Sequence, residues 1–263
     1  MKDFEDVRYE VDGPAAVVTI DRPHRYNAFR GRTIEELIAA FRTAWADPAV
    51  RCVIFTGAGE KAFCTGGDVK QRAETGDYGP TESGLFEIDG LHRLIREIPK
   101  PVIAAVNGLA IGGGHVFHVL CDLTIAAGHA RFGQAGPRVG SFDAGFGTTY
   151  LARIVGEKRA REIWYLCRQY DAATAERWGL VNTVVPGSEL MAEARRWAEE
   201  IAAMSPTAIR FLKHSFNSDT EHQAGLANMA TAALDLFATS PEGLEGARAF
   251  TEKRTPDFAK YVG

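Results

Sequence analysis

The sequence predicts an α/β fold for this chain of 263 residues. In the first two-thirds, short apolar runs of buried-strand type alternate with longer segments of helical periodicity, and such alternation is typical of an α/β core. The last third shows only helical patterns. Hydrophobic residues make up 46% of the chain and charged residues 24%, so a sizeable core can be buried.

The predicted strands are apolar runs that have the length and the composition of buried strands. They are AAVVTI (15–20), RCVIFTG (51–57), PVIAAVNG (101–108) and DLTIAA (122–127).

Two helices are predicted between these strands, over residues 33–47 and 85–98. Thr33 is the expected cap of the first helix, and Glu36 three residues later fits a capping box. The apolar side chains of this helix share one face: Ile34, Leu37, Ile38 and Phe41.

From residue 158 onward, consecutive helices are predicted. Their segments are KRAREIWYLCR (158–168), AATAERWG (172–179), GSELMAEARRWAEEIAAM (187–204), TAIRFLKHSF (207–216), GLANMATAALDLFAT (225–239) and EGLEGARAFTEKR (242–254). Since no linker rich in Pro, Gly and Ser divides the chain, we expect a core over residues 1–200. A helical region over 201–263 is expected to pack on that core or on a neighbouring subunit.

Composition argues against several classes of protein. The net charge of −4 gives no reason to expect nucleic acid or an anionic membrane as a partner. No apolar run approaches the roughly 20 residues of a membrane helix, and the first residues do not resemble a signal peptide. The cysteines and histidines show no disulfide or metal-site spacing. We therefore expect a cytoplasmic protein with no metal and no tightly bound cofactor.

Two glycine-rich stretches, FCTGGDVK (63–70) and NGLAIGGGH (107–115), each follow a strand-like segment. The second also leads into an apolar helix. Glycine permits close approach of the backbone to a ligand, and the first N–H groups of a helix have no intrahelical partner. Two such loops together could hold the negative charge that develops on a carbonyl oxygen during acyl chemistry. The alternative is that both are ordinary tight turns, because neither matches a phosphate-binding motif.

Six segments, taken together and in this order, carry a family resemblance. They are RPHRYNAF (22–29), AFCTGGD (62–68), KPVIAAVNGLAIGGGH (100–115), CDLTIAA (121–127), FGQAG (132–136) and WGLVNTVVP (178–186). The chain resembles the enoyl-CoA hydratase/isomerase (crotonase) superfamily along essentially its whole length. The resemblance implies a spiral of ββα turns, a helical C-terminal extension used for trimerisation, an acyl-CoA substrate, and a homotrimer or a hexamer built from two trimers.

The resemblance also implies roles for the glycine-rich stretches. Gly67 and Gly113 would donate their N–H groups to the thioester oxygen of an enolate. Their neighbours would contact the substrate: Thr65, Gly66, Asp68, Ile111 and Gly112. On the coenzyme A side, Arg25, Thr65 and Lys253 match positions that line the nucleotide or the pantetheine in relatives.

The chain departs from the enoyl-CoA hydratases at the two places where those enzymes carry glutamates. Val116 and Gly136 stand there instead. Adding water to a double bond needs a positioned acid and base, and neither residue can move a proton. A generic hydratase or isomerase activity therefore remains only an alternative.

The stretch that starts at residue 133, GQAGPRVGSFDAGFGTTYLAR, resembles the 1,4-dihydroxy-2-naphthoyl-CoA (naphthoate) synthases more narrowly. These enzymes close a ring on o-succinylbenzoyl-CoA. The resemblance implies that Ser141 holds a ring oxygen and that Asp143 relays or delivers a proton. It also implies that Lys70 and Arg72 lie on a mobile loop over the substrate.

In many of these synthases a bicarbonate ion takes the place of the hydratase glutamate and acts as general base. Gln134, Gly136 and Trp164 match the residues that hold it. The structural alternative is that Gln134 braces its loop and Trp164 is an aromatic residue of the core.

A second family shares nearly the same signature, the 2-ketocyclohexanecarboxyl-CoA hydrolases, which open a ring with water. Segments such as SFNSDTEHQAG resemble these hydrolases, whereas Lys70 and Arg72 resemble the synthases. Both families carry a tyrosine at the position of Ala238, which can donate neither a proton nor a hydrogen bond. Tyr78 or Tyr261 could substitute, or the substrate could differ. A non-catalytic subunit that binds CoA esters or has a structural role is a further alternative.

Overall fold

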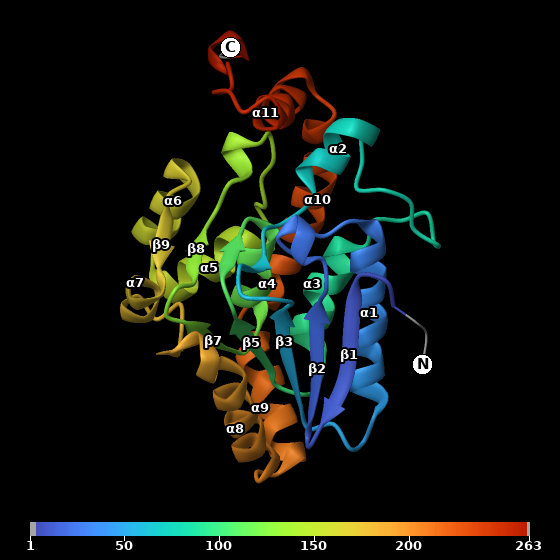
Figure 1. Cartoon of the computed structure of the whole chain (residues 1–263), viewed down its shortest axis with the longest axis vertical. Coiled ribbons are helices and arrows are strands. Elements are labelled where there is room, and N and C mark those ends of the chain that lie inside the picture. Colours follow the sequence, from blue (N-terminus) through green and yellow to red (C-terminus); the bar gives the residue numbers. More distant parts are fainter. Residues whose placement is uncertain (1–3, 262–263) are drawn as a thin grey trace.

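The computed structural model describes residues 4–261 of the chain (Figure 1). Its larger sheet has six strands in the order β1-β2-β3-β5-β7-β10. These strands are β1 (Val7–Asp12), β2 (Ala15–Ile20), β3 (Cys52–Gly57), β5 (Val102–Val106), β7 (Leu123–Ala127) and β10 (Thr183–Val185). Only the β1–β2 pair is antiparallel, and every other neighbouring pair is parallel. The predicted α/β fold is confirmed.

All four strands predicted from apolar runs are present, as β2, β3, β5 and β7. Sequence reasoning missed β1, which lies at an edge and is largely exposed, so that its sequence VRYEVD has no continuous apolar run. It also missed β10, whose three residues are too short to show a period.

The smaller sheet has four strands in the order β4-β6-β8-β9. Its strands are β4 (Ala62–Cys64), β6 (Leu109–Ile111), β8 (Arg131–Gly133) and β9 (Gln169–Asp171), each of three residues. None was predicted. Strand β4 overlaps the start of the first glycine-rich stretch and β6 lies within the second, so this sheet brings those stretches side by side.

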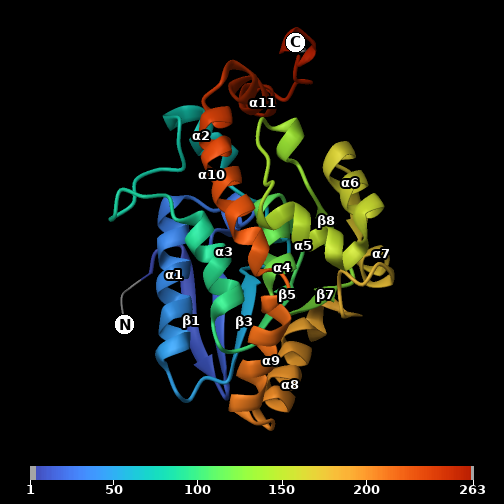
Figure 2. The same cartoon turned by 180° about the vertical axis from the view of Figure 1, so that it is seen from behind.

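Helices cover both faces of the larger sheet, because its strands alternate their side chains between two apolar clusters. Ala15 and Val17 of β2 join the cluster that includes residues of α8 (Leu190–Ala202), whereas Ala16 and Val18 join the cluster under α1 (Gly31–Ala46) and α3 (Ile88–Glu97). In Figure 2, α1 and α3 lie in front of the sheet. The continuous apolar runs of the sequence follow from this two-sided burial.

The predicted helices are present, with shifted ends. Helix α1 begins two residues before the predicted start, and its N-cap is Arg30 rather than Thr33. The Thr33 hydroxyl instead accepts a hydrogen bond from the Arg30 N–H and donates one to Asp6. Glu36 accepts the N–H groups of Glu5 and Asp6, so the predicted capping box is wrong.

The remaining helices flank the sheets and lie beyond both of their ends (Figure 1). They are α2 (Val69–Thr75), α4 (Gly113–Leu120), α5 (Phe146–Val155), α6 (Glu157–Leu166), α7 (Ala172–Arg177), α9 (Pro206–Ser218), α10 (Ala224–Ala238) and α11 (Pro241–Thr251). Short 3₁₀ turns occupy Pro23–Arg25, Gly136–Arg138, Gly187–Glu189, Glu221–Gln223 and Ala259–Tyr261.

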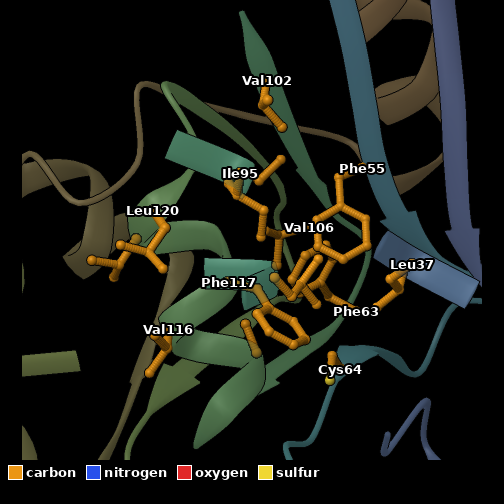
Figure 3. Packing of buried hydrophobic residues seen from close by; sticks show 14 of the residues in the cluster. Leu37, Phe55, Phe63, Cys64, Ile95, Val102, Val106, Val116, Phe117 and Leu120 are labelled. Atoms are coloured by element: carbon orange, nitrogen blue, oxygen red, sulfur yellow. The ribbon is translucent and has the colours of Figure 1, made fainter. Parts of the chain in front are cut away.

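The centre of the larger cluster is aromatic and lies directly under the glycine-rich stretches. Figure 3 shows the rings of Phe55, Phe63 and Phe117 close together, with Phe55 5.2 Å from Phe63 and 5.8 Å from Phe117 between ring centroids. Phe63 is the first residue of the first stretch, and Phe117 belongs to α4, which begins in the second stretch. Both stretches are therefore connected to the same group of packed, buried rings.

The C-terminal helices pack on the core of the same chain. Lys213 of α9 is buried, and its ammonium donates to Asp122 Oδ2 at 2.7 Å and to the carbonyl of Lys100 at 3.0 Å. Helix α11 lies next to α2 in both views (Figures 1 and 2). The division at residue 200 stays a prediction. Within residues 4–261, no helix combines the length and the apolar character that crossing a membrane would require.

Candidate active site

A cavity of about 1560 Å³ opens where the two glycine-rich stretches, the segment 76–90, the loop 134–146 and α10 meet. It has the size of a pocket for a large ligand. Of the residues singled out in the sequence, these line it: Arg25, Thr65, Gly66, Gly67, Asp68, Lys70, Arg72, Ile111, Gly112, Gly113, Gln134, Gly136, Ser141, Asp143 and Trp164. Lys253 does not line it; it is exposed after α11.

The N–H groups of Gly67 and Gly113 are both unused in the described part of the chain. Gly113 is the first residue of α4, where a helix leaves its N–H groups without an intrahelical acceptor. Gly67 forms a β-bridge with Phe29 whose two hydrogen bonds use the carbonyl of Gly66 and the N–H of Asp68. The bridge therefore holds Gly67 in place while leaving its own N–H free.

The two stretches touch each other through their backbones. A Cβ built on Gly66 would lie 3.0 Å from the nitrogen of Gly113, and one built on Gly113 would lie 2.6 Å from the Phe29 ring. Gly66 and Gly112 have φ of +84° and +58°, a backbone conformation that residues other than glycine rarely adopt. Glycine is therefore needed here for close approach, and both N–H groups border the same cavity.

Asp68 is engaged in structural contacts. One of its carboxylate oxygens accepts the Gln71 N–H and caps α2, and the other lies 3.3 Å from the guanidinium of Arg22. Both side chains are buried. Arg25 is partly exposed with its Nε 4.0 Å from Asp68, and the Thr65 hydroxyl donates to the carbonyl of Tyr26.

The two basic residues after Asp68 differ in their surroundings. Arg72 is buried, and its guanidinium donates to the carbonyl of Val139 at 2.8 Å, which ties α2 to the loop that carries Ser141. Lys70 is exposed and makes no hydrogen bond or ion pair with the described residues.

Asp143 has one engaged carboxylate oxygen and one open one. Oδ1 accepts the N–H of Gly145 at 3.1 Å and that of Gly147 at 2.7 Å, so it caps the start of α5. Oδ2 has no hydrogen-bond partner in residues 4–261. The Ser141 hydroxyl has none there either, and both residues are half-buried on the cavity wall.

The residues predicted to hold bicarbonate lie together on the cavity wall. The Trp164 indole N–H donates to the carbonyl of Gly147 at 2.8 Å, and the Gln134 amide nitrogen lies 3.3 Å from Nδ1 of His115. The Oε1 of Gln134 is buried without a partner, and the Gly136 N–H has no acceptor among the described residues. Bicarbonate at this place stays a prediction, and we derive no step through it.

The residues that depart from the relatives also line the cavity. Val116 is buried on the first turns of α4, and a Cβ on Gly136 would lie 2.7 Å from the carbonyl oxygen of Ser141. Ala238 is the last residue of α10 and faces the same space. Of the tyrosines considered as substitutes, Tyr78 lines the cavity, whereas Tyr261 donates to the carbonyl of Pro241 outside it.

An aromatic wall over the glycine-rich stretches was missed by sequence reasoning. The ring of Tyr78 stacks on Phe86 at 4.9 Å and lies 6.0 Å from Phe29. It also lies against Gly67, because a Cβ there would be 2.4 Å from the ring. The resemblance predicted a mobile loop over the substrate and offered Tyr78 as a proton donor. The packing of these rings on one another and on Gly67 could not be predicted, because the segment QRAETGDYGPTES has no apolar period.

A second missed residue is His92 of α3, which is buried and lines the cavity. One signal was present in the sequence: His92 falls between Leu91 and Ile95 on the apolar face of the predicted helix. A polar residue on such a face faces either the core or a cavity.

Comparisons with known proteins agree with this geometry. The model of the enoyl-CoA hydratase/isomerase family matches residues 10–261. This chain belongs to that family. A solved enoyl-CoA hydratase/isomerase from Xanthobacter autotrophicus Py2 is 33% identical, with 97% of this chain and 100% of that chain covered and a TM-score of 0.81.

Two further structures are similar to this family member. An enoyl-CoA hydratase from Mycobacterium avium subsp. paratuberculosis K-10 is 29% identical, with a TM-score of 0.85 and coverage of 97% and 99%. A carnitinyl-CoA hydratase from Mycobacterium avium is 30% identical, with a TM-score of 0.84 and coverage of 96% and 97%. The protein is a crotonase-family acyl-CoA enzyme. Among its described residues, no group of three or more His, Cys, Asp or Glu could hold a metal ion.

Proposed function

We propose that this enzyme makes or breaks a carbon–carbon bond beside a ketone, through a thioester enolate held by the N–H groups of Gly67 and Gly113. The observation that carries the proposal is the pair of unused N–H groups bordering one cavity with the open oxygen of Asp143. Donors aimed at a developing oxyanion typically contribute about 3 kcal/mol each to lowering the barrier.

The walls of the cavity favour a carbocyclic acyl group. Phe29, Tyr78 and Phe86 enclose the side over the glycine-rich stretches, while small side chains of α10 such as Ala227 and Ala230 leave room opposite. A flat, mostly apolar ring packs well against such aromatic faces.

Hydration of a simple enoyl-CoA is disfavoured by the same cavity, although the similar structures named above are hydratases. The positions of the two hydratase glutamates are occupied by Val116 and Gly136, and neither can serve as acid or base. Of the nearby carboxylates, Asp68 is engaged by Arg22, whereas Asp143 keeps an open oxygen on the cavity wall and can hold a proton there.

Within this reaction class, our first candidate is ring closure of o-succinylbenzoyl-CoA, and hydrolytic ring opening of 2-ketocyclohexanecarboxyl-CoA is the second. Ser141 would hold a ring oxygen and Asp143 would move a proton. The test is to incubate the protein separately with both esters and with crotonyl-CoA. Turnover of one ring ester, with crotonyl-CoA at least about 100-fold slower in kcat/KM, supports the proposal. Turnover of crotonyl-CoA alone contradicts it.

Asp143→Asn is the matched variant for this test. Asparagine retains the oxygen that accepts the Gly145 and Gly147 N–H groups, so α5 stays capped, but it cannot carry a proton. We expect kcat to fall by about 10²- to 10⁴-fold, with KM nearly unchanged. A protein that binds CoA esters without turnover would show the same binding in both forms and no activity to lose.

We also propose that the chain assembles as a homotrimer or as a pair of trimers. Large apolar side chains on α9 and α10 are exposed, with Phe216 80% and Leu236 78% accessible. Such patches mark contact surfaces more often than chance. Light scattering should give the mass of three or six chains, and Phe216→Glu combined with Leu236→Glu should reduce it. A monomeric mass for the unaltered chain contradicts this.

A further inference from the structure

We infer that His92 is a further catalytic residue of the cavity, acting as the proton carrier beside Asp143. This inference rests on the proposed function and deepens it. Val116, Gly136 and Ala238 line the cavity and none can move a proton, so a proton carrier has to come from elsewhere in it.

The imidazole of His92 is unused by the rest of the described chain. The side chain is 6% exposed, and its buried Nε2 has no hydrogen-bond partner. Nδ1 makes no hydrogen bond with the described residues either. Because an unpaired buried polar group costs stability, such groups in native proteins call for a functional explanation. Nδ1 is not among the buried unpartnered atoms, so it is the nitrogen of this lining residue that can pair with a substrate or a water molecule in the cavity.

The ring is also held in one orientation. It packs edge-on between Phe117 of α4 at 5.7 Å and Phe146 of α5 at 5.2 Å between centroids. These two helices and α3 fix its position from three directions, so little rotamer freedom remains to be lost during reaction. Such preorganisation is what an acid–base group needs.

The surroundings of His92 keep its imidazole neutral and place two carboxylates near it. Burial lowers the pKa of His92 below its ordinary value of 6.5, while the carboxylates of Asp143 and Asp89 oppose that shift. Asp89 pairs with Arg93 through Oδ2 at 2.8 Å and its Oδ1 is buried without a partner among the described residues, whereas Asp143 lines the cavity with Oδ2 open. The other cation of this face, Arg96, lies over Tyr150 and donates to Asn217 and Thr220. The imidazole is therefore neutral at pH 7 and able to accept a proton.

Ring opening can be written with this one group. An imidazole nitrogen takes a proton from water while the water oxygen bonds to the ring ketone carbon. The bond between that carbon and the carbon next to the thioester breaks, and its electron pair enters the enolate, whose oxygen faces the N–H groups of Gly67 and Gly113. The former ketone carbon becomes a carboxylic acid, and the imidazolium returns the proton to the carbon next to the thioester. Ring closure is the same sequence reversed, with water as the leaving group.

The test compares three variants with the unaltered enzyme on the ring ester that it turns over. His92→Gln keeps a donor and an acceptor but cannot exchange a proton, and His92→Phe keeps the packing against Phe117 and Phe146. His118→Gln is the matched control, because His118 is equally buried with an unpartnered Nε2 but does not line the cavity. Folding is checked by thermal unfolding and by the affinity for a non-reacting CoA ester.

We expect both His92 variants to lose about 10²- to 10⁴-fold in kcat with KM changed less than about threefold, and His118→Gln to keep its kcat within about threefold. In His92→Ala, added imidazole should restore part of the kcat, which a purely structural role would not allow. If folded His92→Gln or His92→Phe keeps its kcat, the inference is wrong while the proposed function stands. If the unaltered enzyme turns over neither ring ester, the proposed function itself fails and the inference falls with it.

Discussion

The two walls of the cavity are built in opposite ways. The inner wall, formed by residues 63–70 and 107–116, consists of backbone packed against backbone over a buried aromatic base. The outer wall, formed by the segment 76–90 with α10, presents side chains of which several are exposed, Leu85 at 62% and Phe86 at 40%. The comparison teaches that the enolate end of the site is set by backbone geometry, whereas the acyl end is set by side chains.

The largest effect is expected from Arg22, which holds the inner wall together. Its buried guanidinium lies 3.3 Å from Asp68 and 3.5 Å from Asp6, and it donates to the carbonyl of Ala28. Arg22→Met leaves two buried carboxylates with weaker compensation, so we expect the free energy of unfolding to fall by about 3–5 kcal/mol. Urea denaturation measures this. A loss below about 1 kcal/mol would show that the inner wall does not depend on this pair.

Gly114 tests the close backbone packing of the same wall. A Cβ there would lie 2.0 Å from the carbonyl oxygen of Cys64, so Gly114→Ala should destabilise the fold by about 1–3 kcal/mol. Gly225 of α10 is the matched control, because nothing lies within 4 Å of its Cβ direction. Gly225→Ala should stabilise the protein by about 0.5–1 kcal/mol. Equal effects at both positions would contradict the contrast between the walls.

The inner wall should also respond to acid through His115, which lies under it on α4. Burial lowers the pKa of His115 from 6.5 to about 3. Below pH 6.5 the unfolded chain binds a proton that the folded chain does not, so stability falls as the pH falls, on the order of 1 kcal/mol per pH unit for one proton. His115→Gln should make the dependence between pH 6.5 and pH 4 shallower in urea denaturation. If the pH dependence of the unfolding free energy is the same in His115→Gln, a residue other than His115 causes the loss of stability in acid.

The smallest effect on stability is expected in the outer wall. Phe86→Ala removes the ring stacked on Tyr78, yet Phe86 is 40% exposed, so the unfolding free energy should change by less than about 1 kcal/mol. The same substitution should raise KM for a ring ester several-fold, because it removes apolar contact area. Steady-state kinetics and thermal unfolding on one preparation check both halves. A large loss of stability with unchanged KM would show that Phe86 supports the fold and does not contact the substrate.

Much of the fold could be predicted because two-sided burial leaves continuous apolar runs, as in β2 and β3. The edge strand β1 and the three-residue strands of the smaller sheet have no continuous apolar run, so they could not be predicted in this way. The same division applies to the site. Gly66, Gly112 and Gly113 could be singled out because only glycine tolerates their φ or their contacts, and the structure brings them together.

The sequence by itself determined which places lack side chains, and the structure shows the helix start at Gly113 and the close backbone contact at Gly66 that use them. Only the tertiary structure decided which side chains meet across the cavity. His92 and Asp143 belong to segments far apart in the chain, and Tyr78 reaches Gly67 through an irregular loop. Local periodicity indicates which face of a segment is buried. It does not indicate which other segment covers that face, because this depends on how the elements pack together.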